Sequence, residues 1–278
     1  MEPRAYSASP IGTNFLIAGY SRTTGSVSLD PSLPINDVRA SINGGRIGYE
    51  RTFGLFGHSA NAGFALPYVA GDLSGKLEDQ SQSISRSGLG DLRLRFAGIL
   101  VGGPALTPAE FAQREPTTTL GASLTIVAPT GDYNPAHLIN ISSNRWAFKP
   151  DVGLSVPLGD WFADGSAGIW LFTDNSNFFN GNTRSQDPLF DFQLHGGYSF
   201  RPGLWLAADA TFYTGGETSI NGAEKHDVQA NSRYGLTLSV PLAEGFSVKF
   251  AWSTWLTTRG GGNFETIGAT LQYRWFDQ

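Results

Sequence analysis

The sequence contains no cysteine among its 278 residues. Disulfide frameworks and thiolate-ligated metal sites are therefore excluded. Long apolar runs are missing too, since no segment approaches the ~18 consecutive apolar residues that mark a transmembrane helix. A membrane location would therefore have to rest on strands, in which only alternate residues face lipid.

Charge is also scarce. Asp, Glu, Lys and Arg make up 15% of the residues, against roughly a quarter in ordinary soluble proteins. The net charge of −5 argues against a nucleic-acid partner. Glycine is abundant at 35 residues, and aromatic residues reach 13%. A protein whose exterior faces lipid needs few surface charges, so this composition favours a membrane protein.

Helical periodicity is almost absent, and only residues 108–114 predict a helical turn, with Pro and Glu early in the segment. Alternation with a period of two recurs instead. The predicted strands span residues 12–24, 39–53, 58–72, 86–101, 117–129, 143–157, 160–174, 187–200, 203–216, 229–241, 245–259 and 263–276. Their number is even, as a closed bacterial barrel requires. We therefore predict one antiparallel up-and-down transmembrane β-barrel domain of about twelve strands over residues 1–278.

Strand length separates this barrel from its fold-level alternative, a soluble β-sandwich. Leu92, Leu94 and Phe96 alternate with Arg93 and Arg95, a pattern that suits either fold. The predicted strands are much longer than the 5 or 6 residues usual in globular sheets, and a tilted strand needs about 9 to 11 residues to cross a bilayer. The apolar faces also end in aromatic residues, as in the interfacial girdles of barrels.

The connections between the strands alternate in length. Tight turns are predicted at residues 54–57, 158–159, 201–202 and 242–244, and longer polar loops at 25–38, 73–85, 130–142, 175–186 and 217–228. Short periplasmic turns and long extracellular loops are typical of outer-membrane barrels. Segment 102–116 is long and 260–262 short against this rule. Both chain ends are then expected on the periplasmic side.

The last predicted strand resembles the signal by which the barrel-assembly machinery recognises its substrates. Gly268, Leu271, Tyr273 and Trp275 carry that resemblance, although the chain continues for three residues beyond Trp275. We expect these residues to form the seam with the first strand near Phe15. The expected partners are accordingly this machinery, outer-membrane lipids and lipopolysaccharide. The start of the chain has no apolar signal core, so a mature form is expected, its signal peptide removed.

The polar face of each strand predicts the lining of the lumen. The candidate lining residues are Arg46, Glu50, Arg93, Arg95, Arg145, Lys149, Asp151, Trp170, Phe172, Asp191, His195, Trp205, Asp209, Arg233, Lys249 and Arg274, with Tyr213 and Trp255 as further aromatic contacts. These charges form either an electrostatic filter or a ladder of mutually paired groups that fills a narrow barrel. Both interpretations stay open at this point. Pro150, in the middle of a predicted strand, indicates a bulge or kink.

The sequence predicts no catalytic group, cofactor or metal site. Asp164, Asp191 and Asp209 are candidate acid–base carboxylates only in principle, because cationic neighbours would keep them ionised. The histidines show no spacing typical of a metal site. A membrane-embedded hydrolase would need a Ser–His pair on one outer face, and His195 is instead predicted to point inward.

Several short motifs, considered together, resemble one family of outer-membrane proteins. They are Pro129-Thr-Gly-Asp-Tyr133, Asn144-Arg-Trp-Ala-Phe-Lys-Pro-Asp-Val-Gly153, Trp170-Leu-Phe-Thr-Asp-Asn175, Gln186-Asp-Pro-Leu-Phe190, Thr214-Gly-Gly-Glu-Thr-Ser-Ile-Asn-Gly222, Asn231-Ser-Arg-Tyr-Gly235 and Gln272-Tyr-Arg-Trp275. The chain is similar over nearly its whole length to the transporters of the phenol-degradation meta pathway. This resemblance implies a barrel that passes small hydrophobic molecules, and it implies no particular binding residues.

Three functions follow from these observations. The first is a passive outer-membrane channel for small hydrophobic or aromatic compounds. The second is a closed structural or adhesin-like barrel that acts through its extracellular loops, which requires a lumen plugged from end to end. The third is the hydrolase, which requires the Ser–His pair.

Overall fold

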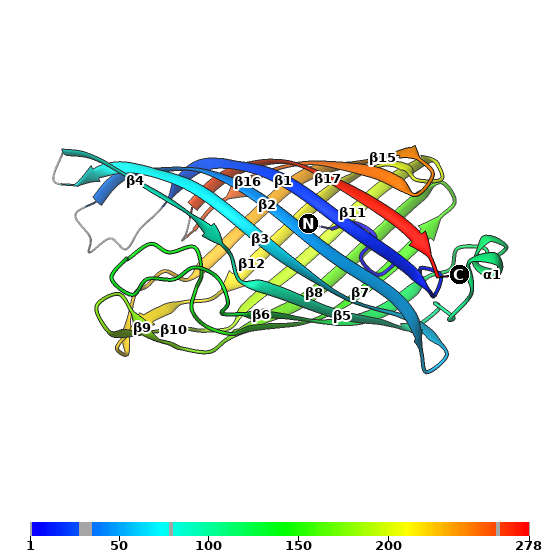
Figure 1. The fold of residues 1–278 in the computed structure, drawn as a ribbon, viewed down its shortest axis with the longest axis horizontal. Helices are drawn as coiled ribbons and strands as arrows, with labels where there is room; N and C mark the ends of the chain where they lie inside the picture. The colour runs from blue at the N-terminus through cyan, green and yellow to red at the C-terminus, as the bar shows by residue number, and fades with distance from the viewer. Residues whose placement is uncertain (1, 28–34, 78–79, 260–261, 278) are drawn as a thin grey trace.

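The computed structural model describes residues 2–27, 35–77, 80–259 and 262–277, which form a closed antiparallel barrel (Figure 1). The wall consists of β1 (Thr13–Val27), β2 (Ile35–Leu55), β3 (His58–Leu77), β4 (Gln80–Leu89), β5 (Leu92–Val101), β6 (Thr119–Ala128), β7 (Ala147–Leu158), β8 (Trp161–Phe172), β11 (Leu189–Arg201), β12 (Leu204–Gly215), β15 (Gln229–Ala243), β16 (Phe246–Thr257) and β17 (Gly262–Phe276). No helix in these ranges has the length and apolar character needed to cross a bilayer.

Each wall strand pairs with its sequence neighbour, and β17 pairs with β1 to close the ring. The sheet has thirteen strands, of which β4 and β5 share one position because both pair with β3. The wall is therefore twelve-stranded. The predicted barrel is confirmed, and closure excludes the β-sandwich.

Two predicted loops are partly strand. Strand β2 begins before its predicted start, β3 ends after its predicted end, and β4 begins at Gln80. Much of the predicted loops 25–38 and 73–85 is therefore strand, which lengthens the wall at β1–β4. Figure 1 shows these strand ends projecting beyond the rest of the barrel. Residues 260–261 of the predicted short turn, and parts of the predicted loops 25–38 and 73–85, lie outside the described residues.

The predicted fourth strand is interrupted at Asp91. The Asp91 carboxylate accepts hydrogen bonds from the Gly131 backbone N–H at 3.1 Å and the Ser142 hydroxyl at 2.6 Å. The Leu89 N–H donates to the Asp132 carboxylate at 2.8 Å. Because side chains and loop backbone take over the hydrogen bonds at this point, the ladder stops at Leu89 and resumes at Leu92. The loop 130–142 is thereby tied to the wall.

The outer face of the wall is apolar. Leu194 is 67% exposed, and Ile47 and Leu16 are 59% and 53% exposed. Large apolar side chains with such exposure form the surface that a lipid bilayer covers. Aromatic residues border it at both ends, with Tyr20 and Tyr68 towards the extracellular side.

The seam between β17 and β1 lies where the sequence predicts it. Tyr273 pairs with Leu16, and Trp275 pairs with Asn14. Three ring contacts run across this part of the wall: Phe246–Tyr273 at 4.5 Å, Tyr273–Trp275 at 5.5 Å and Tyr49–Trp275 at 6.2 Å between centroids. The closing strand is therefore joined by side chains to β16 and, across β1, to β2.

The residues beyond Trp275 also contribute to closure. The Asp277 N–H donates to the Gly12 carbonyl at 2.8 Å. Its carboxylate accepts from the Asn14 amide at 2.8 Å and pairs with Arg51 at 2.5 Å. Asp277, which follows the closing strand, thus adds contacts at the rim.

The predicted helical turn is present but shorter, as α1 (Pro108–Ala112). Thr107 and Glu110 form a reciprocal capping box at its start. Hydrogen bonds from the Thr107 backbone and hydroxyl groups lower the pKa of Glu110. This helix lies at the barrel end where the chain terminates (Figure 1), which we name the periplasmic end after its short turns.

The expected bulge at Pro150 and the expected place of the chain start are wrong. Strand β7 keeps its register with β6 and β8 across Pro150 without a bulge. The ring removes only one N–H, and pairing resumes at Asp151. The chain start does not stay at the periplasmic rim either: residues 2–12 turn back into the barrel (Figure 1), where Arg4 and Tyr6 contact the wall.

Candidate functional site: the barrel lumen

The residues predicted to line the lumen lie on the inner face. Those bordering the central cavity are Arg46, Glu50, Arg93, Arg95, Lys149, Asp151, Trp170 and His195. Trp205, Lys249 and Arg274 border a second cavity towards the periplasmic end, and Asp209 and Arg233 a third towards the extracellular end. Phe172 carries the Arg145 guanidinium over its ring at 4.4 Å.

Lys149 connects two carboxylates on one side of the lumen. Its ammonium lies 3.1 Å from Asp151 and 2.8 Å from Asp191. Gln193 donates to the same Asp191 carboxylate at 2.9 Å. All three charged side chains are nearly buried. The paired-charge interpretation therefore describes this side, formed by β7, β8, β11 and β12, which we call the acidic wall.

His195 completes the acidic wall. Its Nδ1 lies 2.6 Å from the Asp209 carboxylate, whose other oxygen accepts from the Thr237 hydroxyl at 2.6 Å. His195 is thus oriented inside the barrel, as its phase in β11 predicts. In the part of the chain that the structure describes, no serine hydroxyl is hydrogen-bonded to a histidine ring, the arrangement that a hydrolase would require.

The opposite side of the lumen carries cations without such partners. Arg46, Arg93, Arg95 and Lys249 project from β2, β5 and β16, and we call these four residues the basic cluster. Within the described ranges, none of them has a carboxylate within 4.0 Å. Glu2 and Glu50 line both cavities, and the central cavity is also lined by Asp151 and Asp164 of the acidic wall. The filter interpretation therefore applies to this side.

Residues 2–12 form a plug inside the barrel. The Arg4 backbone N–H donates to Asp164 at 2.9 Å, and its guanidinium donates to Ser199 at 2.9 Å. The same guanidinium lies 4.2 Å from the Phe162 ring centroid and 5.7 Å from that of Trp205. Charge-assisted hydrogen bonds and cation–π contacts together hold the segment against the inner wall.

Tyr6 is the second anchor of the plug. Its hydroxyl bonds to Asp151 and to Ser123, the latter at 2.9 Å. Its ring fits over two glycines: a Cβ on Gly153 would lie 2.1 Å, and one on Gly121 2.6 Å, from ring atoms. Since real Cβ atoms do not approach so closely, both positions must stay glycine for Tyr6 to lie flat on the wall.

A cavity of about 300 Å³ remains on the extracellular side of the plug. Tyr6 forms its floor, Trp170 and Ile17 contribute apolar surface, and the basic cluster supplies charge. The lumen is thus narrowed by the plug but not filled from end to end.

The polarity of the β1–β4 wall inverts above the aromatic border. One inward-facing row runs in register across five strands: Phe264, Gly25, Ala40, Leu73 and Ile84. The next row towards the tip, which faces outward, contains Ser26, Arg39, Ser74 and Ser83. We call the apolar inner row the vestibule.

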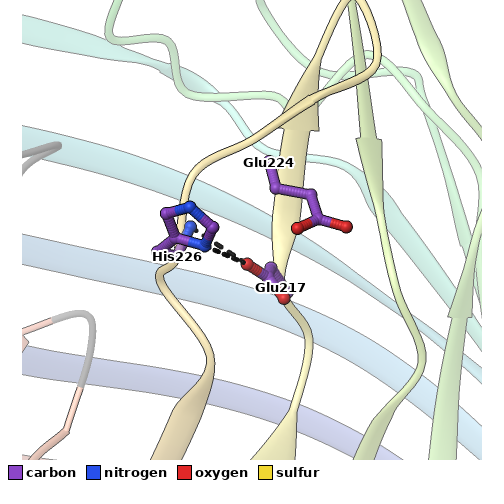
Figure 2. A group of neighbouring side chains, drawn as sticks. All are labelled: Glu217, Glu224 and His226. Carbon is purple, nitrogen blue, oxygen red and sulfur yellow. Dashed lines mark hydrogen bonds and ion pairs between the residues drawn. The ribbon is translucent and has the colours of Figure 1, made fainter.

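The extracellular loops fold into a second sheet of β9 (Asn175–Phe178), β10 (Asn182–Gln186), β13 (Thr218–Ile220) and β14 (Ala223–Glu224). At its edge His226 lies beside Glu217 and Glu224 (Figure 2). The His226 backbone N–H and ring Nδ1 lie 3.0 and 3.3 Å from one Glu217 oxygen. These contacts close the β13–β14 hairpin, and the spacing of histidines along the sequence contains no sign of the cluster.

Replacing Lys149 with methionine should destabilise the barrel strongly. The change leaves the buried carboxylates of Asp151 and Asp191 facing each other without a cation, which costs about 3–5 kcal/mol when a buried pair is broken. Thermal unfolding in detergent, followed by the gel shift of the heat-denatured barrel, measures the effect. Lys76→Met is the matched control, because the Lys76–Asp37 pair is exposed and worth about 1 kcal/mol or less. Equal stability of both variants would contradict the assignment.

Sequence reasoning missed the plug, the vestibule and the loop sheet. Residues 2–12 have no periodicity to mark them, and only the pairing of Arg4 and Tyr6 with a distant wall reveals their place. The vestibule could have been predicted from the sequence, because Leu73 and Ile84 are flanked by polar residues beyond the predicted strand ends.

Comparison with known proteins relates this barrel to outer-membrane barrels of known structure. A search of curated proteins found no significant relative. Among solved structures, an outer membrane channel from Pseudomonas putida F1 superimposes with a TM-score of 0.85 at 23% identity, over 99% of this chain and 100% of that one. The β domain of the Bordetella autotransporter BrkA gives 0.56 at 16% identity, over 95% and 100% of the two chains.

A third solved structure, the TodX monoaromatic hydrocarbon channel, gives a TM-score of 0.51 at 12% identity, over 97% of this chain and 91% of that one. At these identities the structures establish the shared barrel fold. The family described as "Putative MetA-pathway of phenol degradation" matches residues 20–275. The match includes every wall strand in whole or in part, and the chain therefore belongs to this family.

Proposed function

We propose that the protein is a passive outer-membrane channel for small hydrophobic or aromatic compounds. The observation that carries this proposal is the vestibule. Above the aromatic border, the outer face of the wall is polar while the inner face presents Phe264, Leu73 and Ile84. An exposed apolar surface at the mouth of a barrel attracts apolar molecules from water.

The route continues inward along aromatic side chains. Tyr213 and Trp255 lie 5.9 Å apart, and Trp170 and Phe172 stack at 6.4 Å between ring centroids. Such rings offer transient contacts to a planar apolar molecule. Beyond them lies the central cavity, and beyond that the plug. Release then occurs to the periplasm or sideways into lipid.

The family and the neighbouring folds support this proposal. The family description names phenol degradation, and TodX is named a monoaromatic hydrocarbon channel. Within the proposal the protein catalyses no reaction. It is inserted by the barrel-assembly machinery, and its apolar outer face contacts outer-membrane lipids and lipopolysaccharide.

The closed structural barrel is the second candidate, and the plug favours it. Its requirement was a lumen filled from end to end, whereas a cavity of about 300 Å³ remains. The plug is also held largely by hydrogen bonds and ring contacts that can exchange, rather than by a continuous strand pairing. The channel is therefore the better-supported function.

Uptake of toluene by cells that produce the protein tests the proposal. We expect faster uptake than in cells without it, and a several-fold loss in the Leu73→Asp/Ile84→Asp variant, because two carboxylates remove the apolar surface of the vestibule. Ser74→Asp/Ser83→Asp is the matched control, since these serines face outward on the same strands. Uptake that does not depend on the protein would refute the channel.

A further inference from the structure

We propose that the central cavity selects apolar compounds that carry one negative charge, such as aromatic carboxylates, and that the Glu2 carboxylate of the plug is the group that such a compound replaces. This inference rests on the proposed channel function and adds the charge of the cargo. It is carried by the basic cluster and by the chemistry of the residues around it.

The cations of the basic cluster make few hydrogen bonds within the protein, although Arg95 lies 5.7 Å from the Tyr6 ring centroid and Lys249 5.9 Å from that of Trp205. Arg46 donates one hydrogen bond, to Thr270 at 3.1 Å, and Arg95 one at 3.5 Å, to Asn61. Among the described residues, Arg93 has neither a hydrogen bond nor an ion pair. Lys149, by contrast, is held between two carboxylates. The lumen thus pairs its cations on one side and leaves them available on the other.

The architecture of β3 brings these cations to one place. Arg46 on β2 is in register with Pro67 on β3, and Arg93 on β5 is in register with Ala65. The inward residues of β3 here are Gly63, Ala65 and Pro67, all small. The long side chains of the flanking strands can therefore meet in front of β3, where both border the central cavity.

The cavity combines this charge with apolar surface. Trp170, Tyr6 and Ile17 line it together with Arg46 and Arg93. A cavity of about 150 Å³ is enough to hold benzene, so the 300 Å³ cavity has room for one substituted ring. A carboxylate on that ring can accept paired hydrogen bonds from a guanidinium. A ring without a charged group offers the cations no such partner.

In the free protein, the Glu2 carboxylate lies in the positive electrostatic potential of the basic cluster. This carboxylate is attracted by Lys249, Arg95 and Arg46, and it repels the carboxylate of Glu50. Glu2 lies within 4.0 Å of no cation among the described residues, so it neutralises the cluster from a distance. A ligand carboxylate that contacts Arg46 or Arg93 directly is attracted more strongly than the more distant Glu2 carboxylate, and it therefore displaces Glu2. Because Glu2 belongs to the plug, this exchange also weakens the attraction that holds residues 2–12 against the inner wall.

Calorimetry on the purified protein in detergent tests the binding step with sodium benzoate and, as its cationic counterpart, benzylamine. We expect benzoate to bind and benzylamine to bind at least tenfold more weakly. Arg46→Gln/Arg93→Gln should weaken benzoate binding by about tenfold, which corresponds to ~1.4 kcal/mol. Arg22→Gln, on the outer face, should leave it unchanged. Glu2→Gln should strengthen benzoate binding several-fold, because the competing carboxylate is gone.

Cellular uptake separates this inference from the function on which it rests. If the protein speeds the uptake of toluene but not of benzoate, or if the Arg46→Gln/Arg93→Gln variant keeps the wild-type ratio of benzoate to toluene uptake, the anionic cargo is refuted and the channel stands. If neither compound enters faster, the channel itself fails. Equal binding of benzoate and benzylamine would also overturn the inference, and the heat-modified gel shift verifies that each variant is folded.

Discussion

Replacement of both Tyr273 and Trp275 by lysine should abolish insertion into the outer membrane. The change removes one ring contact of β17 with β16, one with β2 and one within β17, each worth about 0.5–1.5 kcal/mol beyond burial. It also places two ammonium groups on the lipid face, at up to 2–4 kcal/mol each near the bilayer midplane and about 0–1 kcal/mol at its edges. Against a total stability of about 5–15 kcal/mol, these losses are large, and they fall on the strand that closes the ring.

The measurement is the yield of folded, heat-modifiable protein in the outer-membrane fraction. Asn263→Lys/Gln272→Lys adds the same charge to the same strand at an exposed strand end and at an inward position. We expect this control to insert normally. A normal yield of the Tyr273→Lys/Trp275→Lys variant would argue against both the seam and the assembly role of these residues.

Removal of the two plug anchors should open the lumen. In an Arg4→Ala/Tyr6→Ala variant, residues 2–12 lose the contacts of Arg4 with Asp164, Ser199 and the Phe162 ring. They also lose the bonds of Tyr6 to the wall. Because the wall strands pair with one another and not with the plug, the barrel should remain closed. We expect single-channel conductance in planar bilayers to rise several-fold.

Two further variants make this result specific. Tyr20→Ala/Arg22→Ala removes the same two residue types from the outer face of β1 and should leave conductance unchanged. Gly153→Val keeps both anchors but places a side chain where the Tyr6 ring lies, 2.1 Å from its nearest atom. It should raise conductance as well. If both plug variants conduct like the wild type, the plug does not limit the channel.

The sequence alone determined the number of strand positions in the wall and which of its side chains face lipid. Alternation in segments such as Leu92–Phe96 sets which side chains face lipid, because successive residues of a strand point to opposite faces. The count of strands, the phase of Asp191, His195 and Asp209, and the closing strand with Tyr273 and Trp275 all follow from that local geometry. No long-range information is needed for any of them.

Only the tertiary structure decided what the lumen contains. The partners of Lys149 lie on its own strand and two strands away, and those of Arg4 and Tyr6 lie more than a hundred residues along the chain. Such pairings depend on the register that ring closure imposes, which local alternation does not encode. For the same reason the sequence left open whether the inward charges are paired. The folded barrel pairs those on the acidic wall and leaves the basic cluster available.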